Sequence, residues 1–144
     1  MVVTLEGATY TRANPMKETV LYVLGSIALV GVAVVFAFFG PYYETGIASW
    51  YGPGFDGNYT ANGEIYDMNG VSAAHKTLPF GTVVRVVEIS TGRSIVVRIN
   101  DRGPFIEGRI IDLSKGAAAE LGIIDKGITE VGLRIVRWPE GERP

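Results

Sequence analysis

The sequence predicts a mainly β protein, in which a single N-terminal transmembrane helix precedes a small β-barrel. Two observations support this fold class. Residues 20–40 form an uncharged apolar run, whereas from Gly46 onward short β-rich runs alternate with Gly, Pro, Asn and Asp. Many short strands, frequent turns and one or two short helices within about 95 residues are typical of a small barrel. The 144 residues suffice for one such domain and a short appendage.

The N-terminal part divides into a short cytoplasmic tail, residues 1–19, and a transmembrane anchor, residues 20–41. A helix of about 21 residues, rising about 1.5 Å per residue, spans the roughly 30 Å hydrocarbon core of a bilayer. Arg12 and Lys17 precede the run and Glu44 follows it, which favours a cytoplasmic N-terminus. A cleaved signal peptide is the alternative, although its apolar region would be shorter. We therefore expect a single-pass protein of the cell membrane whose barrel domain, residues 42–144, faces the periplasm or extracytoplasmic side.

Within the barrel domain, five runs have the composition of strands: residues 46–51, 82–89, 93–99, 109–113 and 132–138. Ser90, Thr91 and Gly92 form a hairpin-like turn between the second and third of these runs. One helix is predicted at residues 115–121, because Ser114 is a suitable N-cap and Gly122 suits the position after the C-terminus. A second, weaker helix is expected around residues 72–76.

The composition excludes several classes of site. The chain has no cysteine, so disulfides, thiolate metal sites and thiol nucleophiles are excluded. His75 is the only histidine and cannot build a histidine-rich metal site. The formal net charge of −2 gives no electrostatic basis for binding nucleic acid. We expect neither a metal nor a cofactor.

Polar residues concentrate in three segments, residues 60–67, 73–81 and 100–105. Asp101 directly follows an apolar strand, which would fix the position of a carboxyl suited to acid/base chemistry. Glu64 and Asp67 would favour its protonated form if they lay nearby, because of their negative charge. Arg102 would act in the opposite direction if its guanidinium pointed at Asp101.

Each of these residues also has a purely structural interpretation. The segment that starts at Asp101 is also typical of a turn leaving a strand, and Asn62 followed by glycine is a common turn signal. A lone histidine such as His75 is more often a structural hydrogen-bonding group than a catalyst. Trp50 and Tyr51 suit either the core or a face on which a sugar ring stacks.

The order and spacing of these segments resemble the rare lipoprotein A family. The resemblance runs from about Gly46 to Trp138 and rests on GIASWYG at 46–52, TANGE at 60–64, AAHKTLPFG at 73–81, NDRGPF at 100–105 and GRIIDLS at 108–114. It implies a six-stranded double-psi β-barrel, related in fold to expansins. It also implies an endolytic lytic transglycosylase that cleaves the β-1,4 bond between N-acetylmuramic acid and N-acetylglucosamine and forms a 1,6-anhydro product without water.

The resemblance also implies roles for individual residues. Asp101 would be the catalytic acid and base, and the other polar positions of the cleft complete the expected catalytic set, namely Glu64, Asp67 and His75. Four further residues are expected to contact the glycan: Trp50, Tyr51, Asn62 and Arg102. The expected partners are peptidoglycan glycan strands, the membrane through the N-terminal helix, and a cell-division or envelope component of unknown identity.

The sequence departs from the family pattern in two respects. It lacks the cysteine that carries the lipid, and the apolar run is expected to replace that anchor. We also expect no C-terminal peptidoglycan-binding domain, which many members carry, so targeting to the septum is not implied. A second hypothesis is therefore a non-catalytic, expansin-like module that binds glycan or loosens the wall. The two hypotheses differ in whether Asp101 is needed for bond cleavage.

Overall fold

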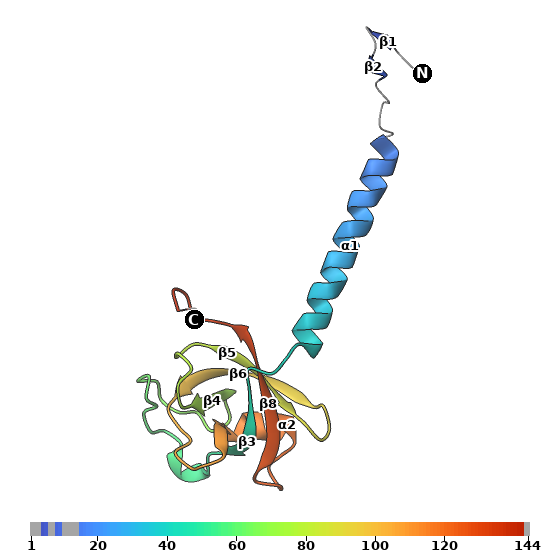
Figure 1. Cartoon of the computed structure of the whole chain (residues 1–144). Coiled ribbons are helices and arrows are strands. Elements are labelled where there is room, and N and C mark those ends of the chain that lie inside the picture. Colours follow the sequence, from blue (N-terminus) through green and yellow to red (C-terminus); the bar gives the residue numbers. More distant parts are fainter. Residues whose placement is uncertain (1–3, 6–7, 10–14, 143–144) are drawn as a thin grey trace. The chain divides into compact units, whose positions relative to one another are not determined.

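The computed structural model describes residues 4–5, 8–9 and 15–142, so most of the predicted tail lies outside the described residues. The chain divides into two compact units, Met1–Gly40 and Pro41–Pro144. In the first unit, the short strands β1 (Thr4–Leu5) and β2 (Ala8–Thr9) pair antiparallel (Figure 1).

Helix α1 (Pro15–Phe39) includes nearly all of the apolar run, so the run is helical, as predicted. Many of its described side chains are apolar and exposed, among them Leu21, Leu24, Ile27 and Leu29. Within the described part of the chain, none of the helices combines the length and the hydropathy that a membrane crossing requires.

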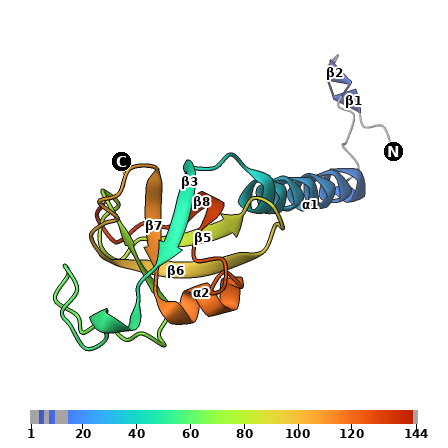
Figure 2. The ribbon, with the colours of Figure 1, turned by 90° about the horizontal axis from the view of Figure 1, so that it is seen from below.

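The second unit is a closed barrel of six strands, which confirms the predicted fold class for this part of the chain (Figures 1 and 2). The order around the barrel is β3-β7-β4-β6-β5-β8. The strands are β3 (Glu44–Trp50), β4 (Ser72–His75), β5 (Val83–Glu88), β6 (Ser94–Asp101), β7 (Arg109–Leu113) and β8 (Thr129–Arg137). All five strands predicted from the sequence are therefore present, with bounds that differ by at most a few residues.

Two short helices accompany the barrel. The 3-10 helix η1 (Pro53–Phe55) lies in the loop after β3, and α2 (Lys115–Leu121) packs against β6, β3 and β7 (Figure 2). The predicted caps of α2 are confirmed: the Ser114 side chain accepts a hydrogen bond from Ala117 N at 3.2 Å, and Gly122 is left-handed with φ 82°.

The weaker helix predicted around residues 72–76 is wrong, because these residues form strand β4. Its helix-forming composition is overridden by pairing on both sides, parallel with β6 and antiparallel with β7. Ala73, Ala74 and His75 are all buried in this central position. A helix of about five residues would also be too short to be stable alone, whereas two flanking strands satisfy the backbone groups of β4.

The register of the barrel brings together segments that are distant in the sequence. Trp50 of β3 is opposite Leu113, Leu113 is opposite Ala73, and Ala74 is opposite Asp101. The last residues of β3 and β6 therefore lie at one level of the barrel wall, with β7 and β4 between them. The loop that follows β3 can thus reach the carboxyl at the end of β6.

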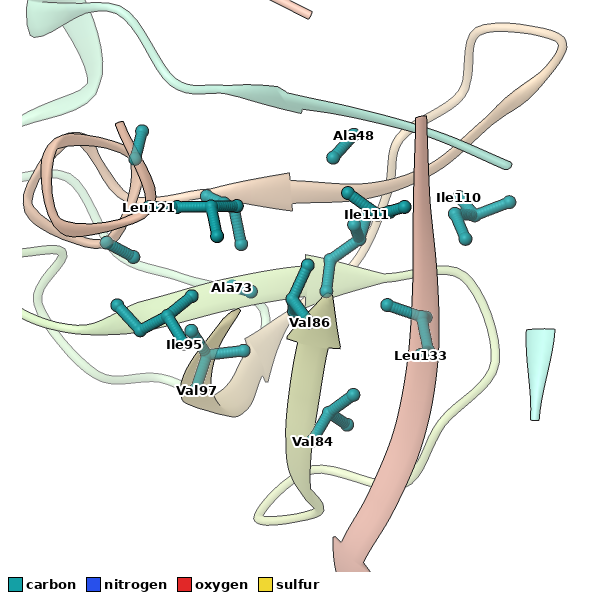
Figure 3. Close-up of a cluster of buried hydrophobic side chains, with 14 of the residues drawn as sticks. Ala48, Ala73, Val84, Val86, Ile95, Val97, Ile110, Ile111, Leu121 and Leu133 are labelled. Carbon is teal, nitrogen blue, oxygen red and sulfur yellow. The ribbon is translucent and has the colours of Figure 1, made fainter. Parts of the chain in front are cut away.

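Apolar side chains on the inner faces of all six strands fill the barrel interior (Figure 3). Figure 3 shows Val84 and Val86 of β5, Ile95 and Val97 of β6, and Leu133 of β8 in one cluster, all of them buried. This packed interior makes the barrel a rigid frame rather than a channel.

Glu88 is a carboxylate buried at the end of β5, with 1% of its side chain exposed. Its oxygens accept hydrogen bonds from Lys126 at 2.6 Å, Thr91 at 2.5 Å and Thr129 at 2.9 Å. These donors, Lys126 first, lower the pKa of Glu88 from 4.5 to about 2. The ionised carboxylate thus joins the β5–β6 turn to the segment before β8.

We expect this carboxylate to make the barrel sensitive to acid. A carboxyl whose pKa is lowered by folding stabilises the fold above its ordinary pKa and loses that contribution as the pH falls toward the folded value. The free energy of unfolding should therefore decrease between about pH 4.5 and pH 2, as measured by chemical denaturation. Glu88→Gln should flatten this dependence and lower stability at neutral pH, whereas Glu120→Gln, on the exposed face of α2, should leave both unchanged. Equal pH dependence of the parent and Glu88→Gln would contradict the assignment.

Candidate active site

A pocket lies beside the end of β6 and the loop that follows β3. Four of its lining side chains are aromatic, and one is a carboxylate. The lining residues are Tyr51, Phe55, Asn58, Tyr59, Thr60, Tyr66 and Asp101. The half-buried carboxyl of Asp101 therefore lies beside aromatic rings.

Asp101 has both carboxyl oxygens engaged. Oδ1 accepts hydrogen bonds from the backbone N–H groups of Ala61 and Arg102, each at 2.8 Å. Oδ2 accepts one from the hydroxyl of Tyr51 at 3.1 Å. The carboxyl is thus fixed by the end of its own strand, by the loop at Ala61 and by the residue after β3, which is more than a simple strand-end turn requires.

Tyr51 is half-buried between two other aromatic side chains. Its ring lies 5.6 Å from that of Phe55 and 5.3 Å from that of Tyr66, the latter edge to face at 76°. Burial, with the charge and hydrogen bond of Asp101 as further causes, raises the pKa of the Tyr51 hydroxyl above its ordinary value. The hydroxyl therefore stays protonated at neutral pH and can donate to Asp101.

The guanidinium of Arg102 is directed away from the Asp101 carboxyl. Its Nη1 donates to the carbonyl of Leu78 at 2.9 Å and to that of His75 at 3.3 Å, and the group lies 3.7 Å from the centre of the Phe80 ring. The Asp101 carboxyl is bonded by the backbone N–H of Arg102, and Nη1 donates only to the backbone carbonyl of Asp101, at 3.5 Å. The side chain thus joins the loop after β4 to the end of β6.

His75 is a buried hydrogen-bonding residue, with 2% of its side chain exposed. Its Nδ1 accepts from the backbone N–H groups of Thr77 and Leu78, so Nε2 carries the proton and donates to Glu44 Oε2 at 2.9 Å. Burial lowers the pKa of His75, and the hydrogen bond with Glu44 opposes this effect only in part. The geometry fits the structural role left open by the sequence, and the catalytic role stays a prediction.

Glu64 is bound by an arginine on the barrel wall. Arg98 donates to its two carboxyl oxygens at 2.8 and 2.7 Å, and Asn100 donates to Oε2 at 3.1 Å. The Arg98 hydrogen bonds, followed by that of Asn100, lower the pKa of Glu64 to about 2. Glu64 is therefore ionised at neutral pH, and Arg98 offsets part of the negative charge that it would exert on Asp101.

Asn62 and Asp67 hold local turns. Asn62 Oδ1 accepts from the Thr60 hydroxyl at 2.6 Å and from Glu64 N at 3.1 Å, while Asp67 Oδ1 accepts from Asn69 N at 2.9 Å. Asn62 N also donates to the carbonyl of Asn100, which fastens this loop to β6. The predicted contacts of Asn62 with glycan, and the catalytic role of Asp67, stay predictions.

Trp50 packs against the hydrophobic core, whereas the next residue, Tyr51, lines the pocket. Three further aromatic residues line the pocket and were not predicted from the sequence: Phe55, Tyr59 and Tyr66. The signal that could have indicated them is the density of aromatic residues in an otherwise turn-rich loop. Tyr59 is 79% exposed and Phe55 is 57% exposed, so both rings are accessible from the solvent.

Among the described residues, no group of three or more histidine, aspartate or glutamate side chains is placed to hold a metal ion. The site consists of a single fixed carboxyl, a half-buried tyrosine hydroxyl that donates to it, and aromatic walls. Such a set can transfer a proton to or from a bound polymer with apolar faces, such as the C–H faces of sugar rings.

Residues 43–133 match the family model described as lytic transglycolase. A probable endolytic peptidoglycan transglycosylase RlpA from Synechocystis is 61% identical to the chain over 92 residues, which make up 64% of this chain and 29% of that protein. The chain thus spans less than a third of the length of this curated relative.

Two solved structures share the barrel fold. A Streptomyces papain inhibitor superposes with a TM-score of 0.53 at 27% identity, covering 67% of this chain and 98% of that chain. An expansin from Clavibacter michiganensis superposes with a TM-score of 0.52 at 26% identity, covering 67% of this chain and 52% of that chain. The fold therefore occurs in proteins with different names and uses, and only the site can distinguish among them.

Proposed function

This chain belongs to the RlpA-like family of double-psi β-barrels, and on that premise we propose that its barrel is an endolytic peptidoglycan lytic transglycosylase. It would cleave the β-1,4 bond between N-acetylmuramic acid and N-acetylglucosamine in cell-wall remodelling. The observation that carries the proposal is the Asp101 carboxyl, which lines the aromatic pocket and is held by three hydrogen bonds. A carboxyl fixed in this way suits proton transfer to a glycosidic oxygen.

The proposed reaction uses one carboxyl twice. Protonated Asp101 first donates its proton to the glycosidic oxygen, and the bond between that oxygen and C1 of the muramic acid breaks, with its electron pair leaving on the oxygen. The C6 hydroxyl oxygen of the same sugar then bonds to C1, and its proton passes to the Asp101 carboxylate. Because the nucleophile is part of the substrate, neither water nor a cofactor enters the proposed steps.

The other predicted residues have supporting roles in this proposal. Glu64, ionised by its pairing with Arg98, would accept hydrogen bonds from sugar hydroxyls. His75 and Arg102 would hold the loop after β4 against the end of β6, and Asp67 would shape the loop next to Tyr66. Glycan would lie along the pocket, in contact with the aromatic walls.

The proposal is tested by incubating the purified full-length chain in detergent with peptidoglycan and analysing the released fragments by mass spectrometry. Fragments that end in 1,6-anhydro-muramic acid are expected. Fragments with reducing ends would instead indicate hydrolysis, and the reaction class would then be wrong. The absence of fragments, together with retained binding to peptidoglycan, would favour the second candidate below.

The second candidate function is a non-catalytic, expansin-like module that binds glycan or loosens the wall. The superposition with the Clavibacter expansin and the exposed aromatic rings favour it, because such rings serve glycan binding as well as catalysis. Two observations favour the enzyme: the higher identity to the Synechocystis relative, and the Asp101 carboxyl that accepts three hydrogen bonds.

We also propose that residues 20–41 attach the chain to the cell membrane and that the barrel lies on the extracytoplasmic side, where its substrate is. The uncharged run and the basic residues before it, Arg12 and Lys17, support this orientation. Alkaline phosphatase fused after Pro144 should be active in cells, and a reporter that works only in the cytoplasm should be inactive there. The reverse pattern would contradict the location and leave the barrel without access to peptidoglycan.

A further inference from the structure

The two oxygens of the Asp101 carboxyl are not equivalent. A carboxyl oxygen has two lone pairs, and Oδ1 uses them for the backbone N–H groups of Ala61 and Arg102, both at 2.8 Å. An oxygen engaged in this way has no room for a proton. The transferable proton of the neutral carboxyl therefore resides on Oδ2, whose only described protein partner is the Tyr51 hydroxyl, at the longer distance of 3.1 Å.

The turn that carries the Ala61 donor is itself fixed. Ala61 lies in a turn closed by hydrogen bonds from Thr60 N to the Glu64 carbonyl and from Gly63 N to the Thr60 carbonyl. The next residue, Asn62, donates to the carbonyl of Asn100, directly before Asp101 in β6. The turn is therefore joined to strand β6. Rotation of the Asp101 carboxyl about its Cβ–Cγ bond would break the two hydrogen bonds to Oδ1.

Tyr51 is held equally firmly from the other side of the pocket. Its backbone N–H donates to the carbonyl of Leu113 at 2.9 Å, which continues the pairing of β3 with β7. Its ring is in contact with those of Phe55 and Tyr66. The hydroxyl consequently reaches Asp101 from a fixed position, and its ring is too enclosed to serve mainly as a face on which a sugar stacks.

We propose that Tyr51 is a positioning residue that binds Oδ2 of Asp101 and thereby presents this oxygen, rather than Oδ1, to the glycosidic bond. The inference rests on the proposed function. While Asp101 is ionised, the Tyr51 hydroxyl donates to Oδ2; when the carboxyl gains a proton, that proton occupies the remaining lone pair of Oδ2 and faces the pocket. The proton then passes from Oδ2 to the glycosidic oxygen, and the proton of the C6 hydroxyl later returns to Oδ2.

Tyr51→Phe tests the inference, because it removes the hydroxyl and keeps the ring. Tyr43→Phe is the matched control: Tyr43 lies outside the pocket and its ring contacts Trp138. The two readouts are kcat and KM, measured separately on soluble, peptide-free glycan strands.

In Tyr51→Phe the value of kcat should fall about 10-fold, since the reacting oxygen is no longer held in place, while KM stays near that of the parent. Tyr43→Phe should match the parent in both readouts.

An unchanged kcat in Tyr51→Phe would overturn the inference. A rise in KM with normal kcat would also overturn it, because Tyr51 would then serve glycan binding rather than the carboxyl. A parent chain that releases no anhydro fragments overturns the proposed function and this inference together. An active parent with an unaffected Tyr51→Phe variant overturns this inference alone.

Discussion

Asp101→Asn is expected to lower the release of 1,6-anhydro fragments from peptidoglycan by about 10²–10⁴-fold, the usual contribution of general acid/base catalysis. The substitution removes the only transferable proton from the carboxyl position but keeps its shape. The amide oxygen can still accept from Ala61 N and Arg102 N, and the amide nitrogen can donate to the Tyr51 hydroxyl. The fold and the binding of glycan strands should therefore survive.

Asp125→Asn is the matched control, since Asp125 is an exposed residue in the segment between α2 and β8. It should cleave at the rate of the parent. Fragment release by mass spectrometry and co-sedimentation with peptidoglycan separate cleavage from binding. If Asp101→Asn cleaves normally while Glu64→Gln is inactive, the roles of the two carboxyls must be exchanged. If neither substitution matters, the catalytic site is elsewhere on the chain.

Gly116→Ala should destabilise the barrel domain by about 1–3 kcal/mol, although alanine is the better helix former. A Cβ at this position would lie 2.4 Å from the carbonyl oxygen of Asn69 and 2.7 Å from that of Gly70, both of them backbone atoms. Alanine would favour the helix by up to about 1 kcal/mol, but the collision with rigid backbone is the larger effect. Either α2 or the loop at residues 69–70 must move, and that loop continues from Tyr66 in the pocket wall.

The measurement is the thermal midpoint of unfolding, which should fall by about 4–8 °C for each kcal/mol lost in a domain of this size. Gly54→Ala is the control, because no heavy atom lies within 4 Å of the Cβ it would add. A Gly116→Ala variant at least as stable as the parent would contradict this prediction, because the loop at residues 69–70 would then move without loss of stability.

Much of the barrel could be predicted from local patterns. The strands β5 and β6 were predicted because apolar residues surround a turn, and α2 because Ser114 and Gly122 supply both caps. These signals lie within a few residues of the elements they define. The helix predicted at β4 was wrong for the opposite reason. The conformation of this segment depends on β6 and β7, which flank it in space, and not on its own alanines.

The candidate site divides in the same way. Asp101 could be singled out because it directly follows an apolar strand. The partners of the charged side chains could not be predicted, because each depends on the closed barrel. Arg98 pairs with Glu64, and the Arg102 guanidinium bonds to three backbone carbonyls rather than to the Asp101 carboxyl. The aromatic walls of the pocket were missed since their residues lie in a loop without a regular pattern.

The pairing of Tyr51 with Asp101 has a consequence for folding. The two residues are 50 positions apart, and no short-range contact can assemble them. Their meeting requires β6 to join β4 and β3 to join β7, parallel pairings that close long loops and are slow to form. On the proposed mechanism, a chain in which these pairings have not yet formed lacks a positioned carboxyl and should cut glycan more slowly than the closed barrel. The rate at which anhydro fragments are released during refolding should therefore rise as the barrel closes.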